Sequence, residues 1–161
     1  MKLKKLYAFA ATVVMAFAAA LFGAPNSYAD DPLMKLETVD TYKCLLPYGA
    51  SRNDGANIVQ WDCGALHPAQ YWRYSGGMLI NQNSGRCMTP YGGSHAGGAY
   101  IVQWDCNTLS TLHKWDRLTT GNGKYYYRNV ATGLYLRVWN DSVDNGTNVI
   151  QSTGGGTAFA R

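Results

Sequence analysis

The sequence is poor in charge, and the charge that it has is nearly balanced. Charged residues make up 15% of the chain, and the formal net charge is +4. Lys2, Lys4 and Lys5 account for most of this excess, because without them 11 basic residues face 10 acidic ones. A protein that binds nucleic acid usually carries a basic patch or stripe, and no such stripe follows the first lysines. We therefore expect no nucleic acid partner.

The rest of the chain also lacks the marks of a helical protein and of the common enzymes. No long segment shows the 3.6-residue period of an amphipathic helix, and residues 91–98 hold too many glycines for a helix interior, where each costs about 1 kcal/mol. β-rich pieces at residues 36–39, 78–80 and 125–128, with turn sequences such as residues 83–85, predict an all-β domain. No Gly-x-Ser-x-Gly, His-Glu-x-x-His or phosphate-binding loop is present. We therefore expect no catalysis and no cofactor.

The one long apolar run, residues 6–22, stands near the start, behind the basic head. Small residues at Ser27 and Ala29 follow it at the spacing that a signal peptidase requires. The pattern predicts a signal peptide at residues 1–29 and one secreted domain at residues 30–161. A membrane anchor is the alternative, but a run of about 17 residues is at the lower limit for a span. We expect no membrane insertion after signal cleavage.

A repeated motif organises the remainder. Ile-Val-Gln-Trp-Asp-Cys occupies residues 58–63 and returns 43 positions later at residues 101–106. An altered third copy ends at Gln151 and is followed by Ser152, where the other copies have tryptophan. Three units of this length cannot each bury a core, so they must share one around a pseudo-threefold axis. The predicted units are residues 36–74, 78–118 and 125–161. Their closing aromatics, expected to form a shared core layer, are Trp72, Trp115 and Phe159.

The four cysteines fall in the first two units. An even number of cysteines in a small exported domain predicts disulfides, with three possible connectivities. If each unit closes on itself, the pairs are Cys44–Cys63 and Cys87–Cys106, and each loop of about 20 residues gives about 3 kcal/mol. Zinc is the alternative use of four cysteines. The absence of a Cys-x-x-Cys pair and the predicted export disfavour it, so we expect no metal.

The two Cys-x(18)-Cys units, each with Ile-Val-Gln-Trp-Asp-Cys and the first followed by Gln70-Tyr71-Trp72, resemble the ricin B-chain type of lectin domain. This family includes carbohydrate-binding modules of bacterial glycosidases, and the resemblance covers essentially all of residues 30–161. It implies a β-trefoil of three repeats of about 40 residues with pseudo-threefold symmetry. The activity that it implies is non-catalytic binding of sugars, often galactose or xylan units.

The resemblance also implies where a sugar pocket lies in each unit. The family combines an aspartate two positions after the first cysteine, an aromatic platform two positions before the second, and an Asn-Gln pair before the closing tryptophan. The platform is present as Trp61 and Trp104. The aspartate position is instead occupied by Leu46, Thr89 and Arg137 in the three units, and the glutamine position by Gln70, His113 and Thr157. No unit therefore has the complete pocket.

Two further sets of residues are candidates for binding sugar. Aromatic residues just beyond the missing aspartate, Tyr48, Tyr91 and Trp139, offer stacking surfaces, or else they only cover the loop ends. Asp62 and Asp105 sit beside the platforms and either accept sugar hydroxyls or cap turns. As a glycosidase carboxylate pair they are excluded, because equivalent positions of a symmetrical fold lie far apart.

These observations predict a secreted lectin that binds a polysaccharide or a cell-surface glycan. An aromatic face covering about 60 Å² of sugar gives about 1.5 kcal/mol, and with a few hydrogen bonds one pocket reaches only the millimolar range. Several pockets on one polymer would provide useful affinity. The alternative is a protein-interaction trefoil, as an inhibitor or as the targeting subunit of a secreted complex or toxin with a partner chain.

Overall fold

The computed structural model describes residues 31–65 and 67–160. The predicted signal peptide and its cleavage site lie outside the described residues. Within them the chain is all-β, with short 3-10 turns and no α-helix. No helix in this part of the chain is long and apolar enough to cross a membrane. The strands are β1 (Met34–Lys35), β2 (Glu37–Thr38), β3 (Lys43–Pro47), β4 (Ile58–Asp62), β5 (Tyr71–Ser75), β6 (Met78–Asn81), β7 (Cys87–Pro90), β8 (Ile101–Trp104), β9 (Trp115–Gly121), β10 (Lys124–Asn129), β11 (Tyr135–Val138), β12 (Val149–Ser152) and β13 (Phe159–Ala160).

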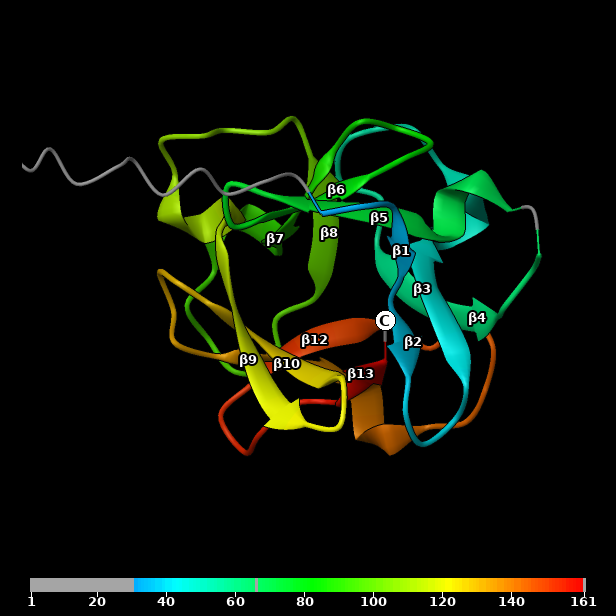
Figure 1. The fold of residues 1–161 in the computed structure, drawn as a ribbon. Helices are drawn as coiled ribbons and strands as arrows, with labels where there is room; N and C mark the ends of the chain where they lie inside the picture. The colour runs from blue at the N-terminus through cyan, green and yellow to red at the C-terminus, as the bar shows by residue number, and fades with distance from the viewer. Residues whose placement is uncertain (1–30, 66, 161) are drawn as a thin grey trace, which may run out of the picture.

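A ring of strand pairings forms a barrel. β5 pairs with β6, β9 with β10, and β13 with β2, so that the last strand of each unit pairs with the first strand of the next. β1, which lies just before unit 1, pairs with β5, and β10 pairs with β13 within unit 3. Units 1 and 2 are also joined at the β5–β6 turn, where Trp115 N at the start of β9 donates to Gly77 O at 2.7 Å. The ring closes where β2 lies beside β13, near the C-terminus (Figure 1). Closure leaves the barrel strands without a long open edge.

The β-rich segment at residues 36–39 contains a shorter strand than its sequence suggests. Only Glu37–Thr38 is in a strand, β2; Leu36 lies between β1 and β2, and Val39 lies in the following turn. The interruption occurs because the chain changes partner: β1 pairs with β5, whereas β2 pairs with β3 and β13. Val39 N then donates to Ala158 O at 2.9 Å.

Each unit also contributes a hairpin outside the barrel: β3–β4 in unit 1, β7–β8 in unit 2 and β11–β12 in unit 3. Single bridges connect the second strands of these hairpins in a cycle, namely Asn57 with Val102, Tyr100 with Ile150, and Asn148 with Val59. The three bridges join equivalent positions. The predicted three repeats with pseudo-threefold symmetry are therefore confirmed, and the fold is a β-trefoil.

Buried glutamines of the repeated motif dock each hairpin onto a neighbouring loop. Gln103 is fully buried, and its Nε2 donates to Ser51 O at 2.8 Å and to Asn53 O at 2.9 Å. Its Oε1 accepts from Ser84 Oγ at 2.7 Å. The same three-bond pattern recurs at the equivalent Gln60 and Gln151. These amides satisfy loop carbonyls that would otherwise lose their hydrogen bonds on burial.

A large apolar cluster fills the barrel and the inner faces of the hairpins, and a smaller one of Leu46, Val59 and Ala69 lies apart from it. Trp72, Trp115 and Phe159 are at most 1% exposed and belong to the large cluster, which confirms the predicted core layer. The two indoles each donate Nε1–H to a backbone carbonyl, of Leu45 at 2.9 Å and of Met88 at 3.1 Å. The disulfides join Cys44 to Cys63 and Cys87 to Cys106, the within-unit pairing that the repeat predicts.

Candidate functional site

A hollow of about 580 Å³ opens in unit 1 beside the end of β4. We call it the unit-1 hollow. The indole of Trp61, which is 42% exposed, forms one wall of the hollow. Leu46 also lines it; this nearly buried side chain occupies the position where the family has aspartate. Its lining residues are Leu46, Tyr48, Gly49, Ala50, Trp61, Asp62, Cys63, Gly64, His67 and Gln70. The structure thus brings together five of the predicted site positions of this unit.

The equivalent hollow in unit 2, the unit-2 hollow, measures about 220 Å³. Trp104 is its exposed aromatic wall, and Thr89 takes the place of the family aspartate with its hydroxyl directed to Leu112 O at 3.4 Å. The lining comprises Thr89, Pro90, Gly92, Gly93, Val102, Trp104, Leu112 and His113. Units 1 and 2 therefore share one arrangement: a hollow lined by an exposed tryptophan and by an uncharged residue at the family's aspartate position.

Gln70 and His113 line these hollows and form hydrogen bonds with the neighbouring backbone. The Gln70 amide accepts from Gly64 N at 2.7 Å and donates to Asp62 O at 2.8 Å, so both ends of it are used. His113 is 9% exposed, and its Nδ1 accepts from Asn107 N at 3.4 Å. Burial lowers the pKa of this imidazole below its usual 6.5, so His113 is neutral at pH 7.

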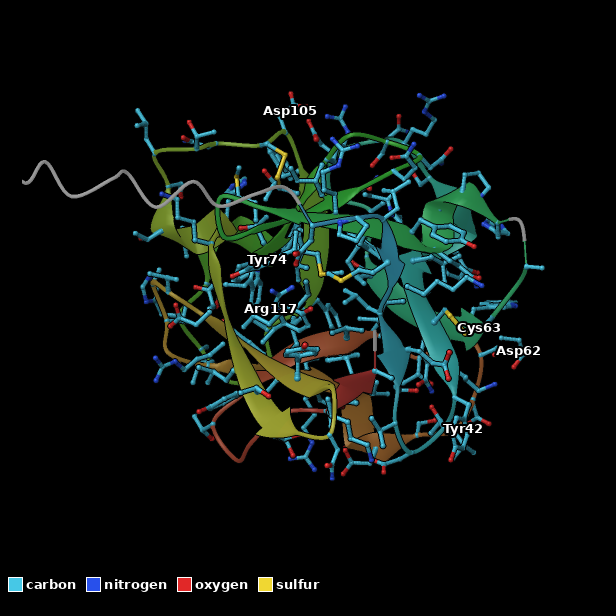
Figure 2. The ribbon with its side chains drawn as sticks, in the orientation of Figure 1. Tyr42, Asp62, Cys63, Tyr74, Asp105 and Arg117 are labelled. Carbon is cyan, nitrogen blue, oxygen red and sulfur yellow. A yellow bond between two sulfur atoms is a disulfide. The ribbon has the colours of Figure 1, made fainter. Side chains whose placement is uncertain are left out.

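The carboxylates of Asp62 and Asp105 each pair with a basic residue across the hairpin of their own unit, and Asp62 also contacts unit 3. Asp62 accepts from Lys43 and from Asn145 Nδ2, the latter at 2.8 Å, and these two contacts lower the pKa of the Asp62 carboxyl. Asp105 forms an ion pair with Arg86. Figure 2 shows the two aspartates at separate edges of the molecule, directed outward. They therefore do not form a carboxylate pair, and only Asp62 lines a described hollow.

The polar clusters around Asp62 and around Asp105 also contain residues that were not among the predicted site residues. Arg86 also pairs with Asp54 at 3.0 Å, and Asp54 accepts from Asp105 N at 2.9 Å. Lys43 donates to Asn145 Oδ1 at 2.8 Å in the equivalent cluster. A signal was available, because the residue before the first cysteine of each cysteine-containing unit is basic.

The three predicted stacking aromatics stand on equivalent 3-10 turns after the first hairpin strand: Tyr48–Ala50, Tyr91–Gly93 and Trp139–Asp141. All three side chains are exposed, by 61% for Tyr48, 59% for Tyr91 and 43% for Trp139. The turns require left-handed backbone, which Ala50 adopts at φ +53° without being glycine. Strain of this kind costs about 1–3 kcal/mol and is common near functional sites.

Unit 3 departs from this arrangement. Ser152 removes the platform, and Arg137, in the aspartate position, forms a bidentate pair with Asp141. Trp139 lies over Gly98 of unit 2, its Cζ3 3.9 Å from the point where a side chain would begin. In the other units this glycine position is covered by a platform tryptophan, since Trp61 lies 3.5 Å from the corresponding point on Gly146. An indole from the neighbouring turn therefore replaces the missing platform.

A family model described as a ricin-type beta-trefoil lectin domain-like domain matches residues 68–152, more than half of the chain. The chain belongs to this family. A ricin-type trefoil fold implies carbohydrate binding, and the sequence resemblance to this family is confirmed. No curated protein sequence matches the chain.

Solved structures agree with this ricin-type trefoil fold. The designed threefold-symmetric protein ThreeFoil is 28% identical, with a TM-score of 0.74 over 81% of this chain and 97% of that chain. The exo-beta-1,3-galactanase 1,3Gal43A from Clostridium thermocellum is 24% identical, with a TM-score of 0.70 over 78% of this chain and 29% of the enzyme. The hemolytic lectin CEL-III is 20% identical, with a TM-score of 0.68 over 81% of this chain and 30% of the lectin. The chain spans less than a third of the last two proteins.

Proposed function

We propose that this protein is a secreted, non-catalytic lectin whose domain, residues 30–161, remains after removal of residues 1–29. It binds a polysaccharide or a cell-surface glycan through the unit-1 and unit-2 hollows. The observation that carries the proposal is the repeated pairing of an exposed platform, Trp61 or Trp104, with an adjoining hollow in two equivalent units. The two disulfides fit an extracellular protein.

The missing aspartates change how a sugar would be held. Leu46 and Thr89 are nearly buried and uncharged. Stacking and shape complementarity therefore contribute more to the binding free energy than hydrogen bonds to charged groups do. Tyr48 adds a second aromatic wall in unit 1. The exposed edge of Asp62 and the neutral His113 serve as secondary contacts, while Gln70 acts by positioning Gly64 and Asp62.

Affinity for one hollow is expected to be weak. Covering an indole with a sugar face gives about 1.5 kcal/mol, and a few hydrogen bonds of about 1 kcal/mol each bring the dissociation constant only to the millimolar range. A polymer that reaches both hollows binds more tightly without any new contact. A polysaccharide or a densely glycosylated surface is therefore the ligand class that suits the fold.

The test is a glycan array combined with depletion assays on insoluble polysaccharides, using wild-type protein and Trp61→Ala and Trp104→Ala variants. The proposal predicts retention on at least one glycan and weaker retention for each variant. Leu109→Ala is the matched control, because Leu109 is 91% exposed and lines neither hollow. Silence of the wild type on all glycans would favour a protein-directed role instead.

A further inference from the structure

A second opening adjoins the unit-1 hollow at the boundary between units 1 and 3. It measures about 500 Å³, and we call it the inter-unit groove. It is lined by Tyr48, Ser51, Gly55, Ala56, Asn57, Gly146 and Asn148, with no charged residue among them. The segment before β12 forms one side and runs alongside β4 (Figure 1). Tyr48 lines both the groove and the unit-1 hollow, so the two openings are neighbours on either side of one exposed aromatic side chain.

Two asparagine side chains present hydrogen-bonding groups in this groove. Asn57 Nδ2 donates to Asn148 Oδ1 at 3.1 Å. Asn57 Oδ1 and Asn148 Nδ2 make no other hydrogen bond within the described part of the chain. Both residues are half-buried, and their carbonyls accept from Tyr48 N at 2.8 Å and Trp139 N at 3.0 Å. The remaining acceptor on Asn57 and the remaining donor on Asn148 belong to two amides that contact each other. Sugar hydroxyls, which both donate and accept, match this pair of groups.

Two glycines line the groove and place no side chain at its edges. Gly55 has φ +78° and Gly146 has φ +83°, and a side chain on either would begin 3.5 Å from a tryptophan ring, Trp104 or Trp61 respectively. The two platforms of the proposed lectin site therefore lie against the glycines that line the groove. A chain that leaves the unit-1 hollow across Tyr48 would meet no protruding side chain at these points.

The pseudo-threefold symmetry singles out this boundary. The position equivalent to Asn57 and Asn148 is Tyr100 in unit 2, and Tyr100 is 45% exposed. The boundary between units 1 and 2 pairs Asn57 with Val102, and that between units 2 and 3 pairs Tyr100 with Ile150. The boundary between units 1 and 3 is the one within the described residues that brings two asparagine amides together.

We propose that the inter-unit groove binds the sugars that follow the one held in the unit-1 hollow. The ligand class is then an internal stretch of a neutral polysaccharide rather than a single terminal sugar. A neutral ligand fits the uncharged lining of the groove, and a chain of sugars fits because Tyr48 borders both openings. This inference rests on the proposed lectin function of the unit-1 hollow.

The test is titration calorimetry with oligosaccharides of two, four and six sugars from neutral polysaccharides, beginning with the xylan and galactan series. The proposal predicts that affinity rises about tenfold from two to four sugars, as one or two added hydrogen bonds would give. Asn148→Ala and Ala56→Phe, which fills the groove, are expected to abolish this rise while leaving disaccharide affinity within twofold. Tyr100→Ala is the matched control at the equivalent position and is expected to preserve the rise.

A nuclear magnetic resonance titration gives a second readout that does not depend on the variants. The side-chain amides of Asn57 and Asn148 are expected to shift with the four-sugar ligand and not with the two-sugar ligand. Disaccharide binding without any gain for longer chains would overturn this inference and leave the lectin function standing. Failure of every neutral oligosaccharide to bind the wild type would overturn both.

Discussion

At the scale of single residues, two exposed tryptophans are placed where burial cannot explain them. Trp72 and Trp115 are fully buried and stabilise the core, whereas Trp61 and Trp104 keep more than two fifths of their surface in water. Each of the two exposed indoles lines a hollow, where a bound ligand would cover it. Under the proposed function, the buried pair serves folding and the exposed pair serves recognition.

The first prediction concerns these platforms. Trp61→Ala is expected to weaken binding of a short oligosaccharide to the unit-1 hollow by about tenfold, because about 1.5 kcal/mol of stacking is removed. Unfolding by urea is expected to change little, since the indole is largely exposed. Calorimetry and denaturation on the same preparation check both expectations. A large loss of stability with unchanged affinity would assign Trp61 a structural role.

A second prediction concerns His113. Burial lowers its pKa, so in the unfolded chain it takes up a proton near the usual 6.5, whereas the folded protein resists protonation until lower pH. The unfolded state therefore binds more protons in this window, and the free energy of unfolding falls as pH decreases below about 6.5. His113→Gln, which copies Gln70 of unit 1, is expected to flatten this slope below pH 6.5. An equal slope in both proteins in urea titrations would contradict this account.

At the scale of elements, the hairpins are held to one another by buried amides. The third prediction is that Gln103→Leu lowers the free energy of unfolding by about 3 kcal/mol, because the carbonyls of Ser51 and Asn53 lose their donor on burial. Gln82→Leu is the control, since Gln82 is exposed. Equal urea midpoints for the two variants would refute the docking role of Gln103.

The disulfides give a fourth prediction. Each closes a loop with a sequence separation of 19, which corresponds to about 3 kcal/mol of stabilisation. The double variant Cys87→Ala/Cys106→Ala is expected to lose about this amount in urea unfolding while still binding glycan through the unit-1 hollow. Loss of all binding on folded protein would show that the two units do not act separately.

Much of the arrangement of strands could be predicted because the sequence consists of repeated units. The motif at residues 58–63 and its copies fixed the three units, the core aromatics and the disulfide pairing. The interruption at Leu36 could not be predicted, because it depends on which strands lie on either side of the chain. The ion pairs of Asp62 and Asp105 were missed for the same reason, since Lys43 and Arg86 meet them only across the hairpins.

At the scale of the whole molecule, the three units have diverged. Units 1 and 2 keep a platform and a hollow, unit 3 replaces its site by the Arg137–Asp141 pair, and one boundary gains a groove. Under the proposed lectin function, such a molecule presents two weak sites, and we expect its useful affinity to come from a ligand that reaches both.

The most direct test of this account is depletion of the protein by insoluble polysaccharide, comparing the wild type with the Trp61→Ala/Trp104→Ala double variant. We expect the wild type to be retained, each single variant to be retained less, and the double variant to lose more than the two single losses combined predict, since polymer binding depends on both sites. Equal retention of the wild type and the double variant, with both proteins folded, would contradict the claim that these two tryptophans are the lectin surface.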